Sequence, residues 1–391
     1  MSEWQTCAVP ESLVKNKVGR QNQIPAKEIA EVGRFPVVDQ GQKFVAGYCD
    51  DESKVIDFDL PLIIFGDHTR CFKYVDFPFV LGADGTKVLL PNKKLYDPRF
   101  YYFALLALEI PSRGYNRHFT ILSERSLPLP PLPEQKKIAH ILSTVQRAIE
   151  AQERIIQTTT ELKKALMHKL FTEGLRNEPQ KQTEIGLVPE SWEVVPLSDV
   201  CRFQSGGTPS KKNPAFWAGT IPWVSPKDMK RPRLADVEDH ISQEALESGS
   251  KLAPAGSVFV VVRGMILAKT VPVALAEVPM AINQDMKAIV PGPKLRSDFL
   301  LYALEALREN LFKKVGRSGH GTCTLMGHEV AAFKISLPDL AEQEEIASAI
   351  QNLERKKELH DEKRKQLQDL FRTLLHELMT ANTRVHELEI A

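Results

Sequence analysis

One segment of this chain occurs twice at a fixed offset, and this repeat limits the possible folds more than any other feature. Leu-Pro-Pro-Leu-Pro-Glu-Gln at 129–135 recurs as Leu-Pro-Asp-Leu-Ala-Glu-Gln at 337–343, which is 208 residues later. The correspondence continues without insertion to Met-His-Lys-Leu-Phe-Thr at 167–172 and Leu-His-Glu-Leu-Met-Thr at 375–380. A constant offset over this length predicts two segments with the same structure.

Each copy has the pattern of one long helix. Prolines within 128–133 end any earlier helix and preset the first turn, and Pro338 does the same in the second copy. Neither copy contains Pro or Gly from 134 to 172 or from 342 to 380. We predict a helix for each of these thirty-nine-residue stretches, and each would span roughly 58 Å.

Both predicted helices carry a heptad-like apolar stripe with a polar middle. A helix of this length needs a partner to bury its stripe. One interpretation is that each helix packs on its own domain. The equal lengths and similar stripes favour pairing of the two helices with each other. The predicted pairing residues are Ile138, Leu142, Val145, Ile149, Ile156, Leu166, Leu170, Ile346, Ile350, Leu353, Leu367, Phe371, Leu374 and Leu378.

The regions that precede the two helices also look duplicated, although less clearly. Each has a β-like apolar run that ends in Gly, a later helix-like segment and a polar loop that contains Gly. In order, these are 62–66, 100–108 and 113–118 in the first region, and 258–264, 299–307 and 316–321 in the second. We therefore predict the order globule, long helix, globule, long helix.

Composition excludes several classes of protein. A chain of 391 residues with 43% hydrophobic and 26% charged residues can bury the cores of two or three domains and is not mainly disordered. No apolar run reaches the length of a membrane span, and the residues at the start lead us to expect no export signal. The five dispersed cysteines are typical of reduced thiols, so we expect a cytoplasmic protein without a membrane partner.

The sequence contains no convincing catalytic or metal-binding pattern. Phosphate-loop, dinucleotide-loop, nucleophile-elbow and His-Glu-x-x-His patterns do not occur. Asp97-Pro-Arg-Phe and Asn213-Pro-Ala-Phe approach the base-gripping loop of amino-methylating DNA enzymes, but both lack its second proline. Cys49, His68 and Cys71 match no common zinc spacing and are more readily explained as buried thiols and an ordinary histidine. We predict no catalytic residue, no metal site and no cofactor in this chain.

At this point the chain closely resembles the specificity (S) subunit of type I restriction–modification systems. The resemblance rests on the duplicated elements at 129–139 and 337–347, on Gly-Leu-Val-Pro-Glu-Ser-Trp at 186–192, and on Ser-Gly-Gly-Thr-Pro-Ser at 205–210 followed by Ile-Pro-Trp-Val-Ser. Ile-Phe-Gly-Asp-His-Thr-Arg at 64–70 fits as well. The first globule lacks the Gly-Gly-Thr-Pro-Ser and Ile-Pro-Trp-Val motifs, so the two globules should read different sequences.

The resemblance implies a mixed α/β fold: two target-recognition domains separated by two long helices that form an antiparallel coiled coil. We place the first recognition domain at 1–128, the first helix at 129–175, a linker at 176–186, the second recognition domain at 187–336, the second helix at 337–382 and a C-terminal tail at 383–391. Each recognition domain would read one half of a bipartite site in double-stranded DNA, and the helices would set the unread spacer.

Lys, Arg and small polar residues of the globules are the candidate DNA contacts, because cations hold phosphates and a few side chains read base edges. In the first globule these are Thr69, Arg70, Lys73, Arg113, Asn116 and Arg117. In the second they are Ser210, Lys211, Lys212, Lys227, Lys230, Arg263, Lys269, Arg317, Ser318 and His320. The loops at 113–118 and 316–322 are favoured, although a plain hairpin turn would also explain them.

The same resemblance implies partners that carry the chemistry. Two methylation subunits would bind S-adenosylmethionine and modify adenine, and restriction subunits would use ATP and Mg²⁺. Two other functions stay open at this point. A stand-alone DNA methylase or nuclease would show activity by itself, and a coiled-coil adaptor would bind no DNA and show no dependence on salt.

Overall fold

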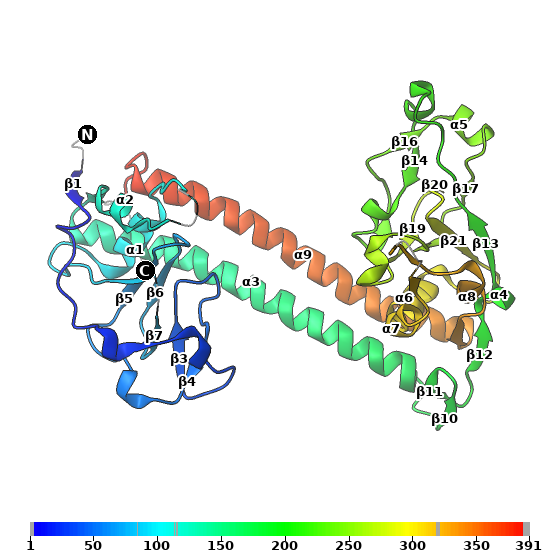
Figure 1. Cartoon of the computed structure of the whole chain (residues 1–391), viewed down its shortest axis with the longest axis horizontal. Helices are drawn as coiled ribbons and strands as arrows, with labels where there is room; N and C mark the ends of the chain where they lie inside the picture. Colours follow the sequence, from blue (N-terminus) through cyan, green and yellow to red (C-terminus); the bar gives the residue numbers. More distant parts are fainter. Residues whose placement is uncertain (1–3, 84, 113, 115, 318–320, 386–391) are drawn as a thin grey trace. The chain divides into compact units, whose positions relative to one another are not determined.

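The computed structural model describes residues 4–83, 85–112, 114, 116–317 and 321–385 (Figure 1). The chain divides into two compact units: unit 1 contains Met1–Arg154 and His360–Ala391, and unit 2 contains Ile155–Leu359. Helices α3 (Leu132–Glu173) and α9 (Leu340–Met379) each run through both units. Each unit therefore combines one globular part with one half of each long helix.

Both predicted long helices are present, and both are shorter than their predicted segments of 129–175 and 337–382. Each begins after a strand, β9 (Ser126–Leu129) in unit 1 and β24 (Lys334–Leu337) in unit 2. Gly174, with a φ of +64°, directly follows the end of α3. Among the described residues, no helix is both long enough and apolar enough to cross a membrane.

The repeated Glu-Gln pair explains why the two helices begin in the same way. The side-chain amide of Gln135 donates to the carbonyls of Leu95 and Pro130, at 2.8 Å each, and its oxygen accepts from the backbone N–H of Asp97. Gln343 makes the corresponding three bonds in unit 2. Both glutamines are fully buried, so each amide needs these partners.

The glutamate of the repeat ties a tryptophan to the start of each helix. In unit 1, Glu134 accepts from the indole N–H of Trp4 at 3.3 Å and from the guanidinium of Arg384 at 2.8 Å. In unit 2, Glu342 accepts from the indole N–H of Trp192 at 3.2 Å. The strand beside each tryptophan pairs antiparallel with the strand before the helix, β1 (Gln5–Ala8) with β9 and β12 (Glu193–Pro196) with β24.

The two helices lie antiparallel within each unit, so the predicted fold class is confirmed (Figure 1). In unit 1, Ile138 and Leu142 of α3 share a core with Leu378 of α9, and the Nδ1 atom of His360 lies 2.7 Å from Oε1 of Gln152. In unit 2, Leu170 of α3 shares a core with two residues of α9, Ile346 and Ile350. Leu166, Phe371 and Leu374 pack against these cores, and the remaining predicted pairing residues are half-buried: Val145, Ile149, Ile156, Leu353 and Leu367.

The globular part of unit 1 is built from short strands and two short helices. A four-stranded sheet has the order β2-β7-β3-β4, and a three-stranded sheet has the order β6-β5-β8. The strands are β2 (Gln23–Ile24), β3 (Phe35–Val38), β4 (Gly47–Cys49), β5 (Leu62–Gly66), β6 (Phe72–Val75), β7 (Val80–Gly82) and β8 (Thr86–Leu89). The helices are α1 (Pro98–Leu106) and α2 (Phe119–Ser123), with 3-10 turns η1 (Arg20–Asn22), η2 (Ala26–Glu28) and η3 (Glu52–Lys54).

The globular part of unit 2 contains a five-stranded sheet, β13-β21-β18-β19-β15, and a four-stranded sheet, β16-β14-β20-β17. Their strands are β13 (Cys201–Ser205), β14 (Ile221–Val224), β15 (Arg233–Leu234), β16 (His240–Ile241), β17 (Leu252–Ala253), β18 (Val258–Val261), β19 (Val273–Ala276), β20 (Met280–Ile282) and β21 (Met286–Pro291). A separate pair is β22 (Gly316–Arg317) with β23 (Cys323–Thr324). The helical elements are α4 (Leu197–Val200), η4 (Pro214–Trp217), η5 (Pro226–Asp228), α5 (Gln243–Glu247), η6 (Met265–Ala268), α6 (Ser297–Ala306), α7 (Arg308–Phe312) and α8 (Gly327–Ala331).

The segments predicted as linker and tail contain more structure than expected. Strands β10 (Gln180–Thr183) and β11 (Gly186–Pro189) form a hairpin within and beyond the predicted linker at 176–186. In the predicted tail at 383–391, the side chain of Val385 is buried in the unit 1 core. Residues 386–391 of the predicted tail lie outside the described residues.

Candidate nucleic-acid interface

Three loops of unit 1 meet at the buried carboxylate of Asp67. Its Oδ1 atom accepts from the backbone N–H groups of His118 at 2.8 Å and Phe119 at 2.7 Å. The backbone N–H of Asp67 donates to the carbonyl of Gly85 at 2.6 Å. The turn after β5, the turn before β8 and the loop before α2 are therefore fixed together.

Thr69 and Arg70, two of the predicted DNA contacts, also join loops. The hydroxyl of Thr69 donates to the carbonyl of Gln40 in the β3–β4 loop. One guanidinium N–H of Arg70 donates to the carbonyl of Ile110 at 2.8 Å. Arg70 is exposed, and its backbone has a φ of +62°. A guanidinium has five N–H donors, so this bond leaves Arg70 with donors for a phosphate or a base.

Lys73 differs from the other predicted contacts because its side chain is buried, with 4% of the residue exposed. Its ammonium donates to the carbonyls of Asp39 at 2.8 Å and Lys43 at 2.5 Å, and it lies 3.4 Å from a carboxylate oxygen of Asp39. Burial lowers the pKa of Lys73 despite the opposing effect of Asp39. An ammonium has three donors, and all three are used here, so Lys73 supports the β3–β4 loop and leaves our set of proposed contacts.

Asn116 and Arg117 are exposed on the loop that Asp67 holds, and Arg113 lies outside the described residues. The structure adds the β3–β4 loop to this surface, with Gln42 and Lys43 exposed on it. Sequence reasoning missed this loop. The signal was present as Asp-Gln-Gly-Gln-Lys at 39–43, a polar stretch with a glycine directly after a short apolar run.

Unit 2 joins three loops in a comparable way. The carbonyl of Asp285 accepts from the backbone N–H groups of Val262 at 2.8 Å and Arg263 at 3.1 Å. The backbone N–H of Gly264 donates to the carbonyl of Cys323 at 3.1 Å, and Cys323 pairs with Arg317 across β22 and β23. The exposed cations Arg263 and Arg317 therefore belong to one connected group of loops, and Lys269 follows η6 in the same group. Ser318 and His320 lie outside the described residues.

The other predicted contacts of unit 2 belong to elements around the four-stranded sheet. Ser210, Lys211 and Lys212 are exposed before η4, and Lys230 is exposed after η5. Lys227 forms ion pairs with Glu238 and Asp239, each at 3.0 Å, and hydrogen bonds to these carboxylates raise its pKa. Because its charge is balanced by two neighbours, Lys227 is the least favourable phosphate contact of this group.

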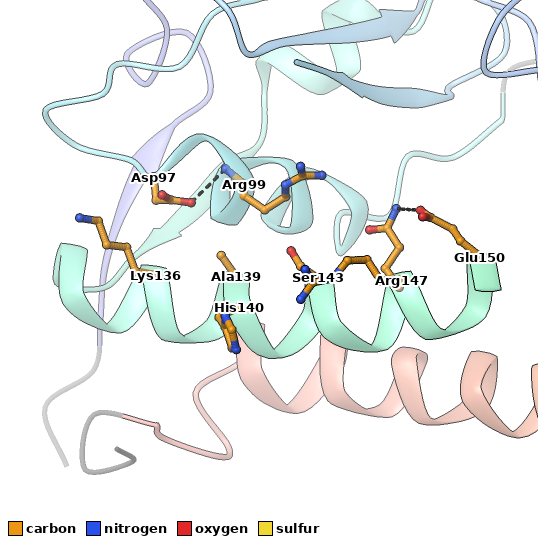
Figure 2. Close-up of a pocket in the computed structure, with 9 residues that line it drawn as sticks. Asp97, Arg99, Lys136, Ala139, His140, Ser143, Arg147 and Glu150 are labelled. Atoms are coloured by element: carbon orange, nitrogen blue, oxygen red, sulfur yellow. Dashed lines mark hydrogen bonds between the residues drawn. The ribbon is translucent and has the colours of Figure 1, made fainter. Parts of the chain in front are cut away.

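A polar pocket of unit 1 lies between α3 and the start of α1 (Figure 2). The pocket is lined by Asp97 and Arg99 at the start of α1 and by residues of α3, which are Lys136, Ala139, His140, Ser143, Gln146, Arg147 and Glu150. The guanidinium of Arg99 lies over the ring of Tyr74 at 3.5 Å and pairs with Asp76 at 3.3 Å. The lining of this pocket therefore carries side chains of both charges.

Among the described residues, no group of three or more His, Cys, Asp or Glu side chains is placed to hold a metal ion. All five cysteines are free thiols, and burial raises the pKa of Cys201 to about 12. Asp97, the first residue of one near-match to a base-gripping loop, instead caps α1 by accepting from the N–H groups of Arg99 and Phe100. Asn213 of the other near-match caps η4 by accepting from Ala215.

The family model and the related proteins that match this chain are all type I restriction specificity proteins. A sequence model of the family described as type I restriction modification DNA specificity domain matches residues 2–160 and 189–369. The chain is 29% identical over 339 residues to the type I restriction enzyme EcoR124I/EcoR124II specificity subunit of Escherichia coli, which covers 84% of this chain and 81% of that protein. It is 27% identical over 293 residues to the MjaVIII specificity subunit of Methanocaldococcus jannaschii, covering 68% and 64%.

The fold has been seen before in solved structures. The S subunit of a type I restriction–modification system from M. genitalium superposes with a TM-score of 0.63, covers 96% of both chains and is 16% identical. A second chain, from a study of complex assembly and conformational transition of the type I R-M system, has a TM-score of 0.53 at 18% identity. At these identities the likeness establishes the fold alone.

Proposed function

The chain belongs to the type I restriction modification DNA specificity family, and from this premise we propose that each unit reads one half of a bipartite site in double-stranded DNA. As a member of this family it is a specificity subunit with two target-recognition regions and not itself an enzyme. The halves of the site differ, because the loops of the two units differ in sequence.

One observation carries the proposal: in each unit, polar loops from distant parts of the sequence are fixed together next to the end of one buried strand. In unit 1 this strand is β5, which ends at Gly66, and in unit 2 it is β18, which is followed by Arg263 and Gly264. In unit 1 the connected loops present Arg70, Asn116 and Arg117. In unit 2 they present Arg263, Lys269 and Arg317. Fixed loops of this kind can hold phosphates with their cations and place a few side chains against base edges.

We further propose that the chain binds the same protein partner twice, once on each unit. Leu370 in unit 1 and Leu162 in unit 2 occupy equivalent positions of the helix repeat, and both are exposed, by 46% and 52%. A leucine that is exposed at the same place in both copies does not serve the core of either unit. A pair of methylation subunits fits two such patches, with S-adenosylmethionine bound in those subunits.

In unit 1 the pocket along α3 would extend this docking surface (Figure 2). Restriction subunits, with ATP and Mg²⁺ as their cofactors, would join the same complex. Replacement of Leu370 by Glu should weaken binding of a methylation subunit to unit 1, and Leu162→Glu should do so in unit 2. Loss of one bound copy per variant, counted by mass spectrometry of the intact complex, would support the assignment, and two retained copies in both variants would contradict it.

DNA binding itself is tested with the full chain in complex with its methylation subunits. We expect tight binding to a duplex that carries the mapped methylation site, weaker binding to random duplexes, and an affinity that falls as salt rises. Equal binding to both duplexes, or no binding and no salt dependence, would refute the proposal and favour a coiled-coil adaptor.

Single substitutions should separate the two halves of the site. Arg317→Ala should reduce discrimination at the half-site of unit 2 and leave the other half intact, and Arg117→Ala should do the reverse. Lys227→Ala is a matched control, because its charge is already paired in unit 2. An equal loss of both halves in either arginine variant would indicate a folding defect or a wrong assignment.

Finally, we propose that the lengths of α3 and α9 set the unread spacer. Removal of residues 145–151 and 361–367 would delete one heptad from each helix next to the Gln152–His360 contact and shorten the pair by about 10 Å. The preferred spacer should then shorten by about three base pairs, at 3.4 Å each. An unchanged spacer in methylation mapping of the variant would exclude this role.

A further inference from the structure

Two exposed apolar residues, Met265 and Ile266, lie in the unit 2 loops that also carry cations, and we call these two residues the apolar tip. Strand β18 leads through Val262, Arg263 and Gly264 into η6, which begins with three large apolar residues in a row. Met265 is 68% exposed and Ile266 is 38% exposed, whereas Leu267 is fully buried in the unit 2 core. Burial of Leu267 accounts for one of the three residues, and the other two need another explanation.

A constrained turn holds this tip in place. Gly264 has a φ of +136° and a ψ of 165°, a conformation that residues with a side chain rarely adopt. Its N–H donates to the carbonyl of Cys323 at 3.1 Å, and its own carbonyl accepts from the N–H of Leu267 at 3.2 Å. Hydrogen bonds therefore fix the backbone of this turn, and the exposure of Met265 and Ile266 is a property of the folded turn.

Three exposed cations belong to the same connected loops as the tip. The side chain of Arg263 is 61% exposed and lies 3.9 Å from a carboxylate oxygen of Asp285, and Lys269 directly follows η6. Arg317 is joined to the turn through Cys323, its partner across β22 and β23. In duplex DNA, phosphates lie on both sides of the stacked bases. The cations could therefore contact phosphates while the apolar residues between them contact a base step.

The corresponding turn of unit 1 has a different chemistry. Gly66 is followed by Asp67, His68 and Thr69, and the carboxylate of Asp67 and the hydroxyl of Thr69 bond to neighbouring loops. The apolar tip therefore distinguishes unit 2 from unit 1 at a matching place in the fold.

We propose that Met265, supported by Ile266, wedges against a base step in the half-site read by unit 2 and partly unstacks it. This inference rests on the proposed function, because it requires that unit 2 binds DNA. Specificity would then come in part from how easily the step deforms, since pyrimidine–purine steps unstack most readily.

The first test compares affinities of the methylation complex for the mapped site. Met265→Ala should weaken binding about tenfold. The slope of affinity against salt should stay unchanged, because an apolar side chain neutralises no phosphate. Arg263→Ala should instead lower that slope by about one. Leu187→Ala is the matched control, since Leu187 is also exposed in unit 2 but lies on β11, outside the loops that carry candidate DNA contacts. The affinity of this variant should equal that of the parent.

The second test reports stacking directly. With 2-aminopurine placed in turn at each step of the unit 2 half-site, the parent should raise the fluorescence of one step. Met265→Ala should abolish this rise and Met265→Leu should keep it. Matching thermal unfolding of parent and variants would exclude a folding defect.

Specific outcomes would overturn the inference. Parent-like affinity and fluorescence of Met265→Ala would place the tip away from the bases. Stronger binding of Met265→Lys to all duplexes would place it beside phosphates, and loss of a methylation subunit in Met265→Ala would make it a protein contact. If the parent complex shows no preference for its mapped site, the proposed function fails, and this inference fails with it.

Discussion

At the scale of single residues, the buried carboxylate of Asp67 organises the candidate DNA surface of unit 1. Replacement of Asp67 by Ala leaves the N–H group of Phe119 without its acceptor, whereas the N–H group of His118 keeps the backbone carbonyl of residue 67 at 2.9 Å. We therefore expect a loss of about 1 to 3 kcal/mol in the free energy of unfolding. Asp67→Asn keeps an acceptor oxygen and should lose less. Urea unfolding measures both, with the exposed Asp57→Ala as control.

Recognition of the unit 1 half-site should weaken together with that stability, because the loops would no longer be held in one arrangement. Full stability of Asp67→Ala would show that other contacts fix these loops.

Lys73 and Arg70 show what sequence could and could not predict about individual contacts. Both are cations near the same short strands, and sequence analysis gave them the same role. In the structure the residues of β6 alternate between half-buried and buried, which places Lys73 on the same face as the buried Val75. Strand periodicity alone would have indicated this face. The carbonyl groups of Asp39 and Lys43, which accept from Lys73, come close only in the folded chain, so they could not be predicted from sequence.

The lowered pKa of Glu134 predicts how the stability of the protein depends on pH. Burial opposes its ionisation, but hydrogen bonds from Arg384 and Trp4 outweigh this and lower its pKa from the ordinary value of 4.5. A carboxyl group with a lowered folded-state pKa stabilises the protein above the unfolded-state pKa, and this stabilisation is lost as pH falls through the folded-state pKa.

We therefore expect the denaturant midpoint of the parent to fall more steeply below about pH 4.5 than that of Glu134→Gln, which cannot titrate there. Parallel curves for the two proteins would contradict a role for this ionisation.

At the scale of elements, the two halves of the coiled coil are alike in backbone and different in chemistry. Phe371 and Lys163 are equivalent under the 208-residue offset. In unit 1 the ring of Phe371 lies 5.9 Å from the ring of Phe103. In unit 2 the ammonium of Lys163 lies between Glu305 at 3.0 Å and Glu354 at 2.5 Å. A lysine in place of Phe371 would meet an aromatic ring instead of carboxylates, so the helix halves are not interchangeable.

Lys163→Met should therefore be strongly destabilising. It leaves the carboxylates of Glu305 and Glu354, each with a side chain 12% exposed, close together without their shared cation. We expect a loss of about 3 kcal/mol in the free energy of unfolding. The double variant Lys163→Met/Glu354→Gln should recover part of this, because one of the two charges is removed. No recovery in chemical unfolding would mean that the packing of Lys163 matters more than its charge.

The long helices were predictable and the sheets were not, for a physical reason. A stretch without Pro or Gly and with a regular apolar stripe specifies a helix locally. The strands of both globular parts contain between two and six residues, and each depends on partners far away in the sequence. The fully buried strand β5 was visible as Leu-Ile-Ile-Phe-Gly, whereas pairs such as β2 with β7 left no local signal.

At the scale of the whole molecule, each compact unit contains one half of each long helix, which our sequence-based boundaries did not anticipate. We predicted boundaries between globules and helices, whereas the chain divides between residues 154 and 155 of α3 and between 359 and 360 of α9. A signal existed beyond the repeat that we followed, because Arg176 and Arg384 also differ by 208 residues. Their shared role at Glu342 and Glu134 becomes visible only when the chain is folded.

Unit 1 should therefore depend on residues near the C-terminal end that unit 2 does not need. A chain that ends at Thr380 loses Arg384, which bonds to Glu134 at 2.8 Å, and Val385, which is buried in the unit 1 core. We expect faster amide hydrogen exchange in β1, β9 and the first turns of α3. Exchange in β12 and β24 should stay unchanged, because their tryptophan, Trp192, bonds to Glu342 within unit 2.

Arg384→Ala in the full chain should reproduce part of this effect in unit 1. Arg176→Ala is the matched control in unit 2, where the guanidinium lies 4.0 Å from Glu342 and its side chain is 48% exposed, so a smaller change is expected. Equal exchange in truncated and full-length chains would mean that Trp4 and the β1–β9 pair fix the start of α3 without help from Arg384. Faster exchange in both units would mean that the two units unfold together, and the division of the chain into separately stabilised units would then be wrong.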